Sequence, residues 1–323
     1  MGTPEFAAPS LKMLIEEGYD LAAVVTQPDR PKGRGGKLAS PIIKDIALEA
    51  GIHVLQPEKP SEIYDEIEAM TIDLCVTAAY GNILRKRFLR IPRYGTVNVH
   101  ASLLPLYRGP SPIHRALLNG DAETGVTTML TDAGVDTGPV LMSESIPIDK
   151  GMYFAELHDQ LAALGASVLK KTIPALLSGA VKPVPQDDSR ATRAPIVQKS
   201  DGNLDFSLGA DQLVNTVRAF SVWPGAVAII HGKRVRVHKA ENGGAADMQS
   251  GVDMWSGAPG SGDAGATHNG AAACGAPGSI ARVARDALSI LCGDGNLFNI
   301  TRLQFENGRA MDISECWHNI KPD

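Results

Sequence analysis

Along the first half of the chain, the spacing of apolar residues switches between short strand-like runs and helical periodicity. Short β-rich runs predict strands at 21–26, 72–79, 96–100 and 126–130. Around them, apolar residues recur at helical spacing over 8–17, 42–50 and 153–177. Strands that alternate with helices are typical of a helix-covered, mostly parallel sheet. This part therefore predicts an α/β domain with a Rossmann-like, doubly wound sheet.

The pattern changes after residue 199. An amphipathic helix is predicted at 211–220, and short alternating runs predict strands at 226–231, 234–239, 279–283 and 288–292. Such runs favour a smaller C-terminal OB-like β-barrel. A segment rich in Gly, Ala and Ser, residues 243–278, interrupts them and is expected to be a disordered insertion, because it offers little to bury.

The length of 323 residues suits two domains of ordinary size. A Pro-rich polar stretch separates the two patterns and is typical of a linker. We therefore expect a first domain at 1–181, a linker at 182–199 and a second domain at 200–323.

Composition narrows the class of protein. A net charge of −5 argues against nucleic-acid binding by bulk charge, so any RNA contact must be local. No apolar stretch is long enough to span a bilayer, and we expect no membrane partner and a cytoplasmic setting. Four cysteines show no paired spacing, which fits a reducing compartment: Cys75, Cys274, Cys292 and Cys316.

Three polar residues carry candidate chemistry. Asn98 and His100 are two residues apart on a predicted strand, so both face the same side at its carboxyl end, where open α/β sheets bind ligands. Asp136 follows another β-rich run in a Gly-flanked loop. We expect the strand ends to bring these three side chains together.

An amide beside an imidazolium can bind the oxyanion of a tetrahedral intermediate, and a nearby carboxylate fixes the imidazole tautomer. No Gly-x-Ser-x-Gly motif supplies a nucleophile, which favours direct acyl transfer between two bound substrates. No metal-ligand cluster is apparent, so no metal is predicted. The alternative is structural: polar groups satisfied at a strand end and an aspartate that forms a turn.

Several motifs carry a resemblance to a known family. The run His100-Ala-Ser-Leu-Leu-Pro-Leu-Tyr-Arg-Gly109, followed by Pro112–Asp121 and Asp136-Thr-Gly, resembles the formyltransferases that use 10-formyltetrahydrofolate. The turn Gly2–Ala7, the basic loop Thr26–Gly35 and the second domain are similar to members that act on methionyl initiator tRNA. The resemblance covers the chain except the insertion and the last few residues.

The resemblance implies transfer of the formyl group of 10-formyltetrahydrofolate to the α-amino group of methionyl initiator tRNA, by a monomer that serves translation initiation. It implies a catalytic trio of Asn98, His100 and Asp136. It also implies a folate-binding segment, Ser102, Leu103, Leu104 and Pro105. The basic loop, with Arg30, Lys32, Arg34 and Lys37, and the C-terminal barrel would bind tRNA.

The resemblance also implies a departure at the start of the chain. Members of the family begin with a further apolar strand before Gly-Thr-Pro, so we expect Met1 to be internal and translation to start about ten residues upstream. Without that strand the sheet would expose apolar faces and unpaired backbone groups.

Three alternatives stay open. A formyltransferase for a nucleotide precursor or an amino sugar would share the trio but would not explain the basic loop. An inactive, truncated RNA-binding form is the second. The third, a nicotinamide oxidoreductase, is disfavoured because Gly2–Phe6 lacks the Gly-x-Gly-x-x-Gly motif.

Overall fold

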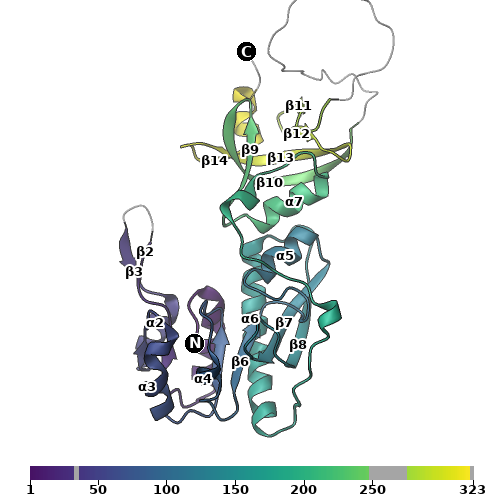
Figure 1. The fold of residues 1–323 in the computed structure, drawn as a ribbon. Helices are drawn as coiled ribbons and strands as arrows, with labels where there is room; N and C mark the ends of the chain where they lie inside the picture. Colours follow the sequence, from purple (N-terminus) through teal and green to yellow (C-terminus); the bar gives the residue numbers. More distant parts are fainter. Residues whose placement is uncertain (33–35, 247–274, 321–323) are drawn as a thin grey trace, which may run out of the picture. The chain divides into compact units, whose positions relative to one another are not determined.

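The computed structural model describes residues 1–32, 36–246 and 275–320, and it contains two compact units (Figure 1). Unit 1 comprises Met1–Ala116 and Asp121–Ile196. Unit 2 comprises Leu117–Gly120 and Val197–Asp323.

Besides the two-stranded hairpin of β2 (Arg30–Lys32) and β3 (Lys37–Ala39), the strands of unit 1 form two sheets. In the smaller one, β1 (Val24–Val25) pairs in parallel with β4 (Val54–Leu55). In the larger one the order is β5 (Cys75–Ala78), β6 (Thr96–His100), β7 (Glu123–Leu130) and β8 (Val140–Pro147). β5 and β6 are parallel, whereas β7 and β8 are antiparallel to their neighbours. The predicted α/β class is confirmed, with an antiparallel edge added to the parallel strands.

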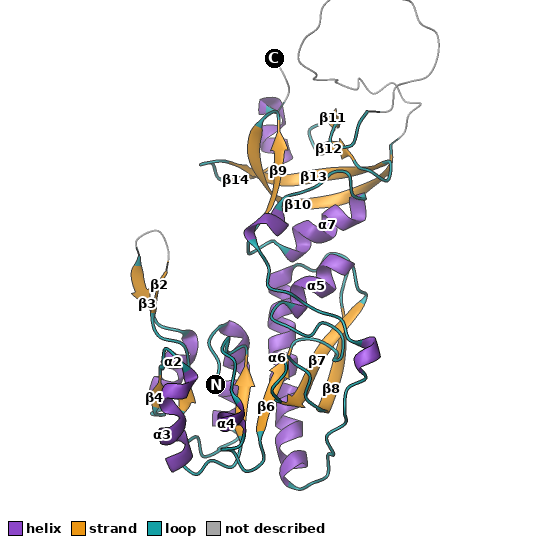
Figure 2. Cartoon of the chain, viewed as in Figure 1, coloured by secondary structure: helices purple, strands orange, loops and turns teal. Residues whose placement is uncertain are grey.

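Figure 2 shows the helices of unit 1, and apolar periodicity predicts three of them, at 8–16, 42–49 and 154–177. The helices of this unit are α1 (Ala8–Glu16), α2 (Ile42–Glu49), α3 (Tyr64–Ala69), α4 (Lys86–Leu89), α6 (Phe154–Leu177) and the first part of α5 (Pro112–Asn119), whose last residues belong to unit 2. At the start of α6, the Glu156 carboxylate accepts from the Tyr153 backbone N–H at 2.9 Å and so caps the first turn. One face of α6 buries a line of apolar side chains: Leu157, Leu161, Val168 and Leu169.

Gly165 lets α6 lie close to the strand that carries the candidate site. A Cβ atom at this position would lie 2.8 Å from Val99 Cγ1 of β6. Real Cβ contacts are longer than this, so the absence of a side chain sets how closely helix and strand pack. Val99 is buried beneath this contact and holds β6 against the core.

Met1 and Gly2 lie between β1 and β5, which do not pair with each other. The Gly2 N–H donates to Val25 O, and the Ala78 N–H donates to Met1 O, each at 3.0 Å. The Met1 ammonium donates to Val76 O at 2.6 Å, and burial lowers its pKa below the usual value. Two residues thus bridge the carboxyl ends of both strands.

A cleft of about 400 Å³ opens toward the amino ends of β1 and β5. Its walls are mostly apolar and come from α1, from residues 21–25 and from residues 70–78. The buried Ser10 hydroxyl also lines it and has no hydrogen-bond partner among the described residues.

Unit 2 contains a six-stranded antiparallel sheet. Its strands run β11 (Ile280–Val283), β12 (Leu288–Leu291), β13 (Asn296–Phe305), β10 (Lys233–Ala245) and β9 (Ala226–Ile230), with β14 (Ala310–Asp312) paired to β13. α7 (Ala210–Ala219) packs on β10 and β13, and α8 (Ile313–Cys316) follows β14. Register shifts between β10 and β13 mark bulges that bend the sheet. Within residues 197–246 and 275–320, no pairing closes the sheet between β9 and β11, so the OB-like barrel is open there.

Two boundaries differ from the sequence expectation. β10 continues through Gly243 to Ala245, which pairs with Asn296, because the ladder needs only backbone groups. Residues 247–274 of the expected insertion lie outside the described residues. Part of the stretch expected to be a linker pairs with unit 1: Val184 exchanges both backbone hydrogen bonds with Val140, and Ala194 is fully buried.

Candidate active site

β6 places Asn98 and His100 on one face of the sheet. Strand alternation turns both side chains away from the buried Val99, which faces α6. Asn98 is half-buried and the His100 side chain is only 7% exposed. The strand therefore holds an amide and an imidazole next to each other in a sheltered place.

Both ring nitrogens of His100 face acceptors. Nε2 lies 3.0 Å from the Tyr107 carbonyl oxygen, and Nδ1 lies 3.6 Å from Asp136 Oδ2. The carbonyl oxygen and the carboxylate both only accept, and the shorter contact assigns the proton of the neutral ring to Nε2, so the Nδ1 lone pair faces the carboxylate. A proton that the ring gains on Nδ1 therefore meets a negative charge.

Asp136 does not reach His100 in the way that the sequence suggests. Because β7 is antiparallel to β6, its last residue Leu130 pairs with Val97, at the end of β6 away from His100. The expectation that strand ends converge is therefore wrong for this residue. Instead the 131–139 loop folds back along the sheet, and the Gly109 backbone N–H donates to Asp136 Oδ2 at 2.8 Å.

The 131–139 loop is braced from within. The Thr137 hydroxyl donates to the Asp132 carboxylate at 2.7 Å, and the Gly134 N–H donates to the same group at 2.9 Å. Asp136 itself has a φ of +53°, in the left-handed region that costs energy for a residue with a side chain. The contacts around it must hold this conformation.

Asn98 is oriented by the neighbouring strand. Thr77 of β5 is its register partner, and the Thr77 hydroxyl donates to Asn98 Oδ1 at 2.9 Å. With the oxygen engaged in this way, the amide nitrogen of Asn98 can serve as a donor to a bound substrate.

A short loop after β6, residues 105–109, supplies the backbone groups that meet His100 and Asp136. Segment 192–194 holds this loop: the Thr192 hydroxyl accepts from the Tyr107 N–H at 2.8 Å, and the Ala194 N–H donates to Arg108 O at 2.8 Å. Gly109 has a φ of +123°, and a Cβ there would lie 2.6 Å from Ala194 O. Only glycine fits this close approach without strain.

The segment expected to bind folate is only partly accessible. Ser102 is fully buried and its hydroxyl donates to Leu106 O at 2.6 Å, so the hydroxyl serves as an internal brace. The Leu104 N–H donates to Thr127 Oγ1 at 3.1 Å, and the Leu104–Pro105 peptide bond is cis. Leu103, Leu104 and Pro105 are half-buried, so they are the members that a ligand can touch.

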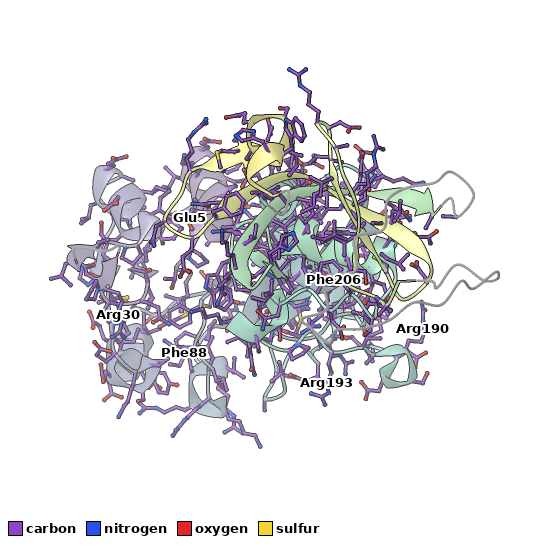
Figure 3. The ribbon with its side chains drawn as sticks, turned by 90° about the horizontal axis from the view of Figure 1, so that it is seen from above. Glu5, Arg30, Phe88, Arg190, Arg193 and Phe206 are labelled. Atoms are coloured by element: carbon purple, nitrogen blue, oxygen red, sulfur yellow. The ribbon has the colours of Figure 1, made fainter. Side chains whose placement is uncertain are left out.

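The basic residues expected to bind tRNA belong to a hairpin of β2 (Arg30–Lys32) and β3 (Lys37–Ala39), which projects from unit 1 beside α2 (Figure 1). Lys32 and Lys37 are cross-strand partners, and Arg34 lies outside the described residues. Arg30 forms an exposed ion pair with Glu58 at 2.9 Å. In Figure 3, Arg30 lies across unit 1 from Arg190 and Arg193.

The carboxylate beside the hairpin is held in its charged form. Hydrogen bonds from Gln56 and Lys44 lower the pKa of the half-buried Asp29 carboxyl below its usual value. Two carboxylates, Asp29 and Glu58, thus accompany the basic residues of the hairpin. An RNA phosphate would have to compete with Glu58 for Arg30.

Sequence reasoning missed three residues of the site: Thr77, Tyr107 and Gly109. Two of them, Tyr107 and Gly109, act through backbone atoms, which no side-chain pattern reveals. Gly109 is the last residue of the His100–Gly109 run, and its place in that run is the one feature of the sequence that points to it.

The described residues contain no group of three or more His, Cys, Asp or Glu side chains placed to share a metal ion. No helix among them is both long and apolar enough to cross a membrane. The arrangement offers an amide donor and an imidazole on one face of β6, with a carboxylate 3.6 Å from the imidazole. Such a set can stabilise an oxyanion and relay a proton.

Comparison with known proteins identifies the family. The model of the formyl transferase family matches residues 1–173, and the model of the formyl transferase C-terminal domain matches residues 196–321. The chain therefore belongs to the formyl transferase family. Its curated relatives include methionyl-tRNA formyltransferases, which confirms the narrower resemblance seen in the sequence.

The similarity extends over both chains. The chain is 44% identical to the methionyl-tRNA formyltransferase of Ruminiclostridium cellulolyticum, over 100% of this chain and 96% of the relative. It is 42% identical to that of Myxococcus xanthus, over 100% and 95%, and 41% identical to that of Geobacter sulfurreducens, over 98% and 91%.

Solved structures share the fold at much lower identity. An N-formyltransferase from Helicobacter canadensis, in complex with folinic acid and dTDP-3-aminofucose, has a TM-score of 0.63 at 17% identity and covers 93% of this chain and 96% of its own. HypX from Aquifex aeolicus, in complex with tetrahydrofolic acid, has a TM-score of 0.55 at 17% identity, over 84% of this chain and 43% of its own.

Proposed function

We propose that this protein transfers the formyl group of 10-formyltetrahydrofolate to the α-amino group of methionine esterified to initiator tRNA. The observation that carries the proposal is identity of 41–44% to methionyl-tRNA formyltransferases over nearly the whole of both chains. Likeness to the sugar formyltransferase is far weaker, at 17% identity, and concerns the fold.

The reaction exchanges one C–N bond for another. The neutral α-amino nitrogen attacks the formyl carbon, and the carbonyl π electrons move to oxygen to form a tetrahedral intermediate. The bond from that carbon to N10 of the folate then breaks as the carbonyl forms again. The amine loses one proton and N10 gains one, so the products are formylmethionyl-tRNA and tetrahydrofolate.

The site supplies a group for each stage. The Asn98 amide nitrogen donates to the oxyanion, because Thr77 already engages the amide oxygen. His100, once protonated, adds positive charge beside it, and Asp136 faces His100 Nδ1 to stabilise that charge. The same pair relays the proton from the attacking amine to the leaving nitrogen.

The folate donor is proposed to lie along residues 103–105, which directly follow the catalytic strand. Leu103, Leu104 and Pro105 offer half-buried apolar surface within a few residues of His100. Fixed apolar walls with a few polar groups at one end suit a flat heteroaromatic ligand. The buried Ser102 would shape this surface from below.

The β2–β3 hairpin is proposed to contact the acceptor end of the tRNA through Arg30, Lys32, Arg34 and Lys37. The Arg34→Ala variant should raise the KM for tRNA and leave the KM for the folate unchanged. Identical kinetics with wild-type protein would remove Arg34 from the tRNA site. The C-terminal unit is proposed as a second, local RNA contact, and the protein is proposed to act as a cytoplasmic monomer.

A formylation assay tests the function. Purified protein and 10-formyltetrahydrofolate are combined with charged initiator tRNA, with charged elongator methionine tRNA, and with an amino sugar nucleotide. We expect rapid formylation of the initiator and little of the other two. Formyl transfer to the sugar nucleotide at a comparable rate would contradict the proposed acceptor.

A further inference from the structure

One side chain joins the two loops that meet at His100. Gln186 Nε2 donates to Asp136 O at 2.9 Å and to Gly138 O at 2.7 Å. Gln186 Oε1 accepts from Arg108 Nε at 3.0 Å. Each polar atom of the amide is therefore engaged, and its partners lie in the 105–109 loop and the 131–139 loop.

These two loops hold the candidate catalytic pair. The 105–109 loop supplies Tyr107 O to His100 Nε2 and the Gly109 N–H to Asp136 Oδ2. The 131–139 loop supplies Asp136 itself. Gln186 thus fixes the 131–139 loop, which carries the Asp136 carboxylate, relative to the 105–109 loop, which donates the Gly109 N–H to that carboxylate.

The contacts need an amide. Two carbonyl oxygens require two N–H donors from one nitrogen, and Arg108 requires an acceptor on the other atom. A carboxylate at this position would place negative charge against both carbonyl oxygens. It would keep the Arg108 contact and lose the two to the 131–139 loop.

The support matters because Asp136 is not in a relaxed conformation. Its φ of +53° costs energy that neighbouring contacts must offset, and Gln186 binds the carbonyl of that same residue. The Arg108 side chain is only 11% exposed and also pairs with Asp188 at 2.7 Å, so Gln186 bonds to a side chain with little freedom to move.

We propose that Gln186 is a positioning residue of the active site. It sets the distance between the Asp136 carboxylate and the His100 imidazole by clamping the 131–139 loop to the 105–109 loop. The expected loss of kcat rests on the proposed formyl transfer. The expected change in the two loops can be measured without any substrate.

The test compares Gln186→Glu with wild type and with the matched control Gln160→Glu, an exposed position on α6. We expect Gln186→Glu to lower kcat about tenfold or more, with little change in either KM, because geometry at the reacting centre is affected and not binding. Amide hydrogen exchange over 132–138 should speed up, and the ¹⁵N resonance of His100 Nδ1 should shift. The control should match wild type in all three.

If Gln186→Glu does not fold, as judged by circular dichroism, Gln186→Met carries the same expectations without a new charge. Unchanged kcat, or unchanged exchange and an unchanged His100 resonance in a folded variant, would overturn the proposal. If wild-type protein shows no formyl transfer, the proposed function fails, and exchange together with the His100 resonance still decides whether Gln186 clamps the loops.

Discussion

The Thr77 hydroxyl donates a hydrogen bond to Asn98 Oδ1 at 2.9 Å across the parallel pair β5–β6. Thr77 is buried, so water does not compete for this contact. The Asn98 amide could otherwise rotate by half a turn and present its oxygen to the substrate, where it would repel a developing oxyanion. A buried threonine on the neighbouring strand thus decides which end of the amide is free to donate.

Replacement of Thr77 tests this relationship. Thr77→Val keeps the shape and removes the hydroxyl, so the amide loses its fixed orientation; we expect kcat to fall by up to about a hundredfold with small changes in KM. Thr77→Ser keeps the hydroxyl and should restore most of the rate. Steady-state kinetics with both substrates measure the effect, and a Val variant as active as the Ser variant would contradict it.

Removal of either oxyanion group should be more costly. Asn98→Ala and His100→Ala are each expected to lower kcat by about a hundredfold or more, the usual consequence of losing one such donor. Circular dichroism should show that both variants fold, since neither side chain fills the core beneath α6. Near-normal turnover in both folded variants would refute their assignment as catalytic residues.

Gly109 should tolerate no side chain. Gly109→Ala forces a Cβ to within 2.6 Å of Ala194 O at a φ of +123°, so the loop must shift and withdraw its N–H from Asp136. We expect a loss of about 1–3 kcal/mol in unfolding free energy and a reduced kcat. Gly179→Ala is the control, because its φ of +74° is also positive but a Cβ there meets no atom within 4 Å. Gly179→Ala should lose stability and keep its kcat. If both variants lost kcat equally, the loss in Gly109→Ala would not come from the 105–109 loop.

The sequence predicts those parts of the fold that depend on local periodicity. α1, α2 and α6 match their predicted ranges within a residue or two, and β6 matches at both ends. The shared face of Asn98 and His100 follows from β6 alone, because alternation is a property of the strand.

The remaining features depend on contacts that periodicity does not encode. Asp136 meets His100 because Gly109 and Gln186, distant in sequence, bond to the 131–139 loop. The segment after α6 has the composition of a free linker, yet it pairs through backbone groups, which are the same in every sequence. Strand β8 was missed because its middle, Ser143-Glu144-Ser145, offers no apolar alternation.

His238 of unit 2 should make stability depend on pH. Burial lowers its pKa below the value of 6.5, and the charges of Arg236 and Arg302 lower it further, against a hydrogen bond with Gln304 that raises it. Below pH 6.5 the unfolded chain therefore binds the proton more readily than the folded one, and stability falls. The contribution is complete above that pH and is lost as the pH drops through the folded value.

Urea unfolding at several pH values from neutral downward measures this effect. His238→Gln keeps a side chain that can bond to Gln304 and removes the titration, so its midpoint should fall less than that of wild type on acidification. Parallel curves for the two proteins would show that His238 does not contribute.

The cleft between β1 and β5 predicts that the protein is stabilised by an apolar strand placed ahead of Met1. Met1 and Gly2 already bridge Val25 and Ala78, so a preceding extended segment would continue between the two strands and pair with both. It would also replace the buried ammonium by an amide that can still donate to Val76 O. Each Val or Ile side chain buried in this way contributes about 1.5–3 kcal/mol.

A variant with an upstream run of alternating Val and Ile should melt several degrees above one with a Gly-Ser run of equal length, as calorimetry would show. Equal melting temperatures for the two extensions would mean that the cleft does not accept a strand.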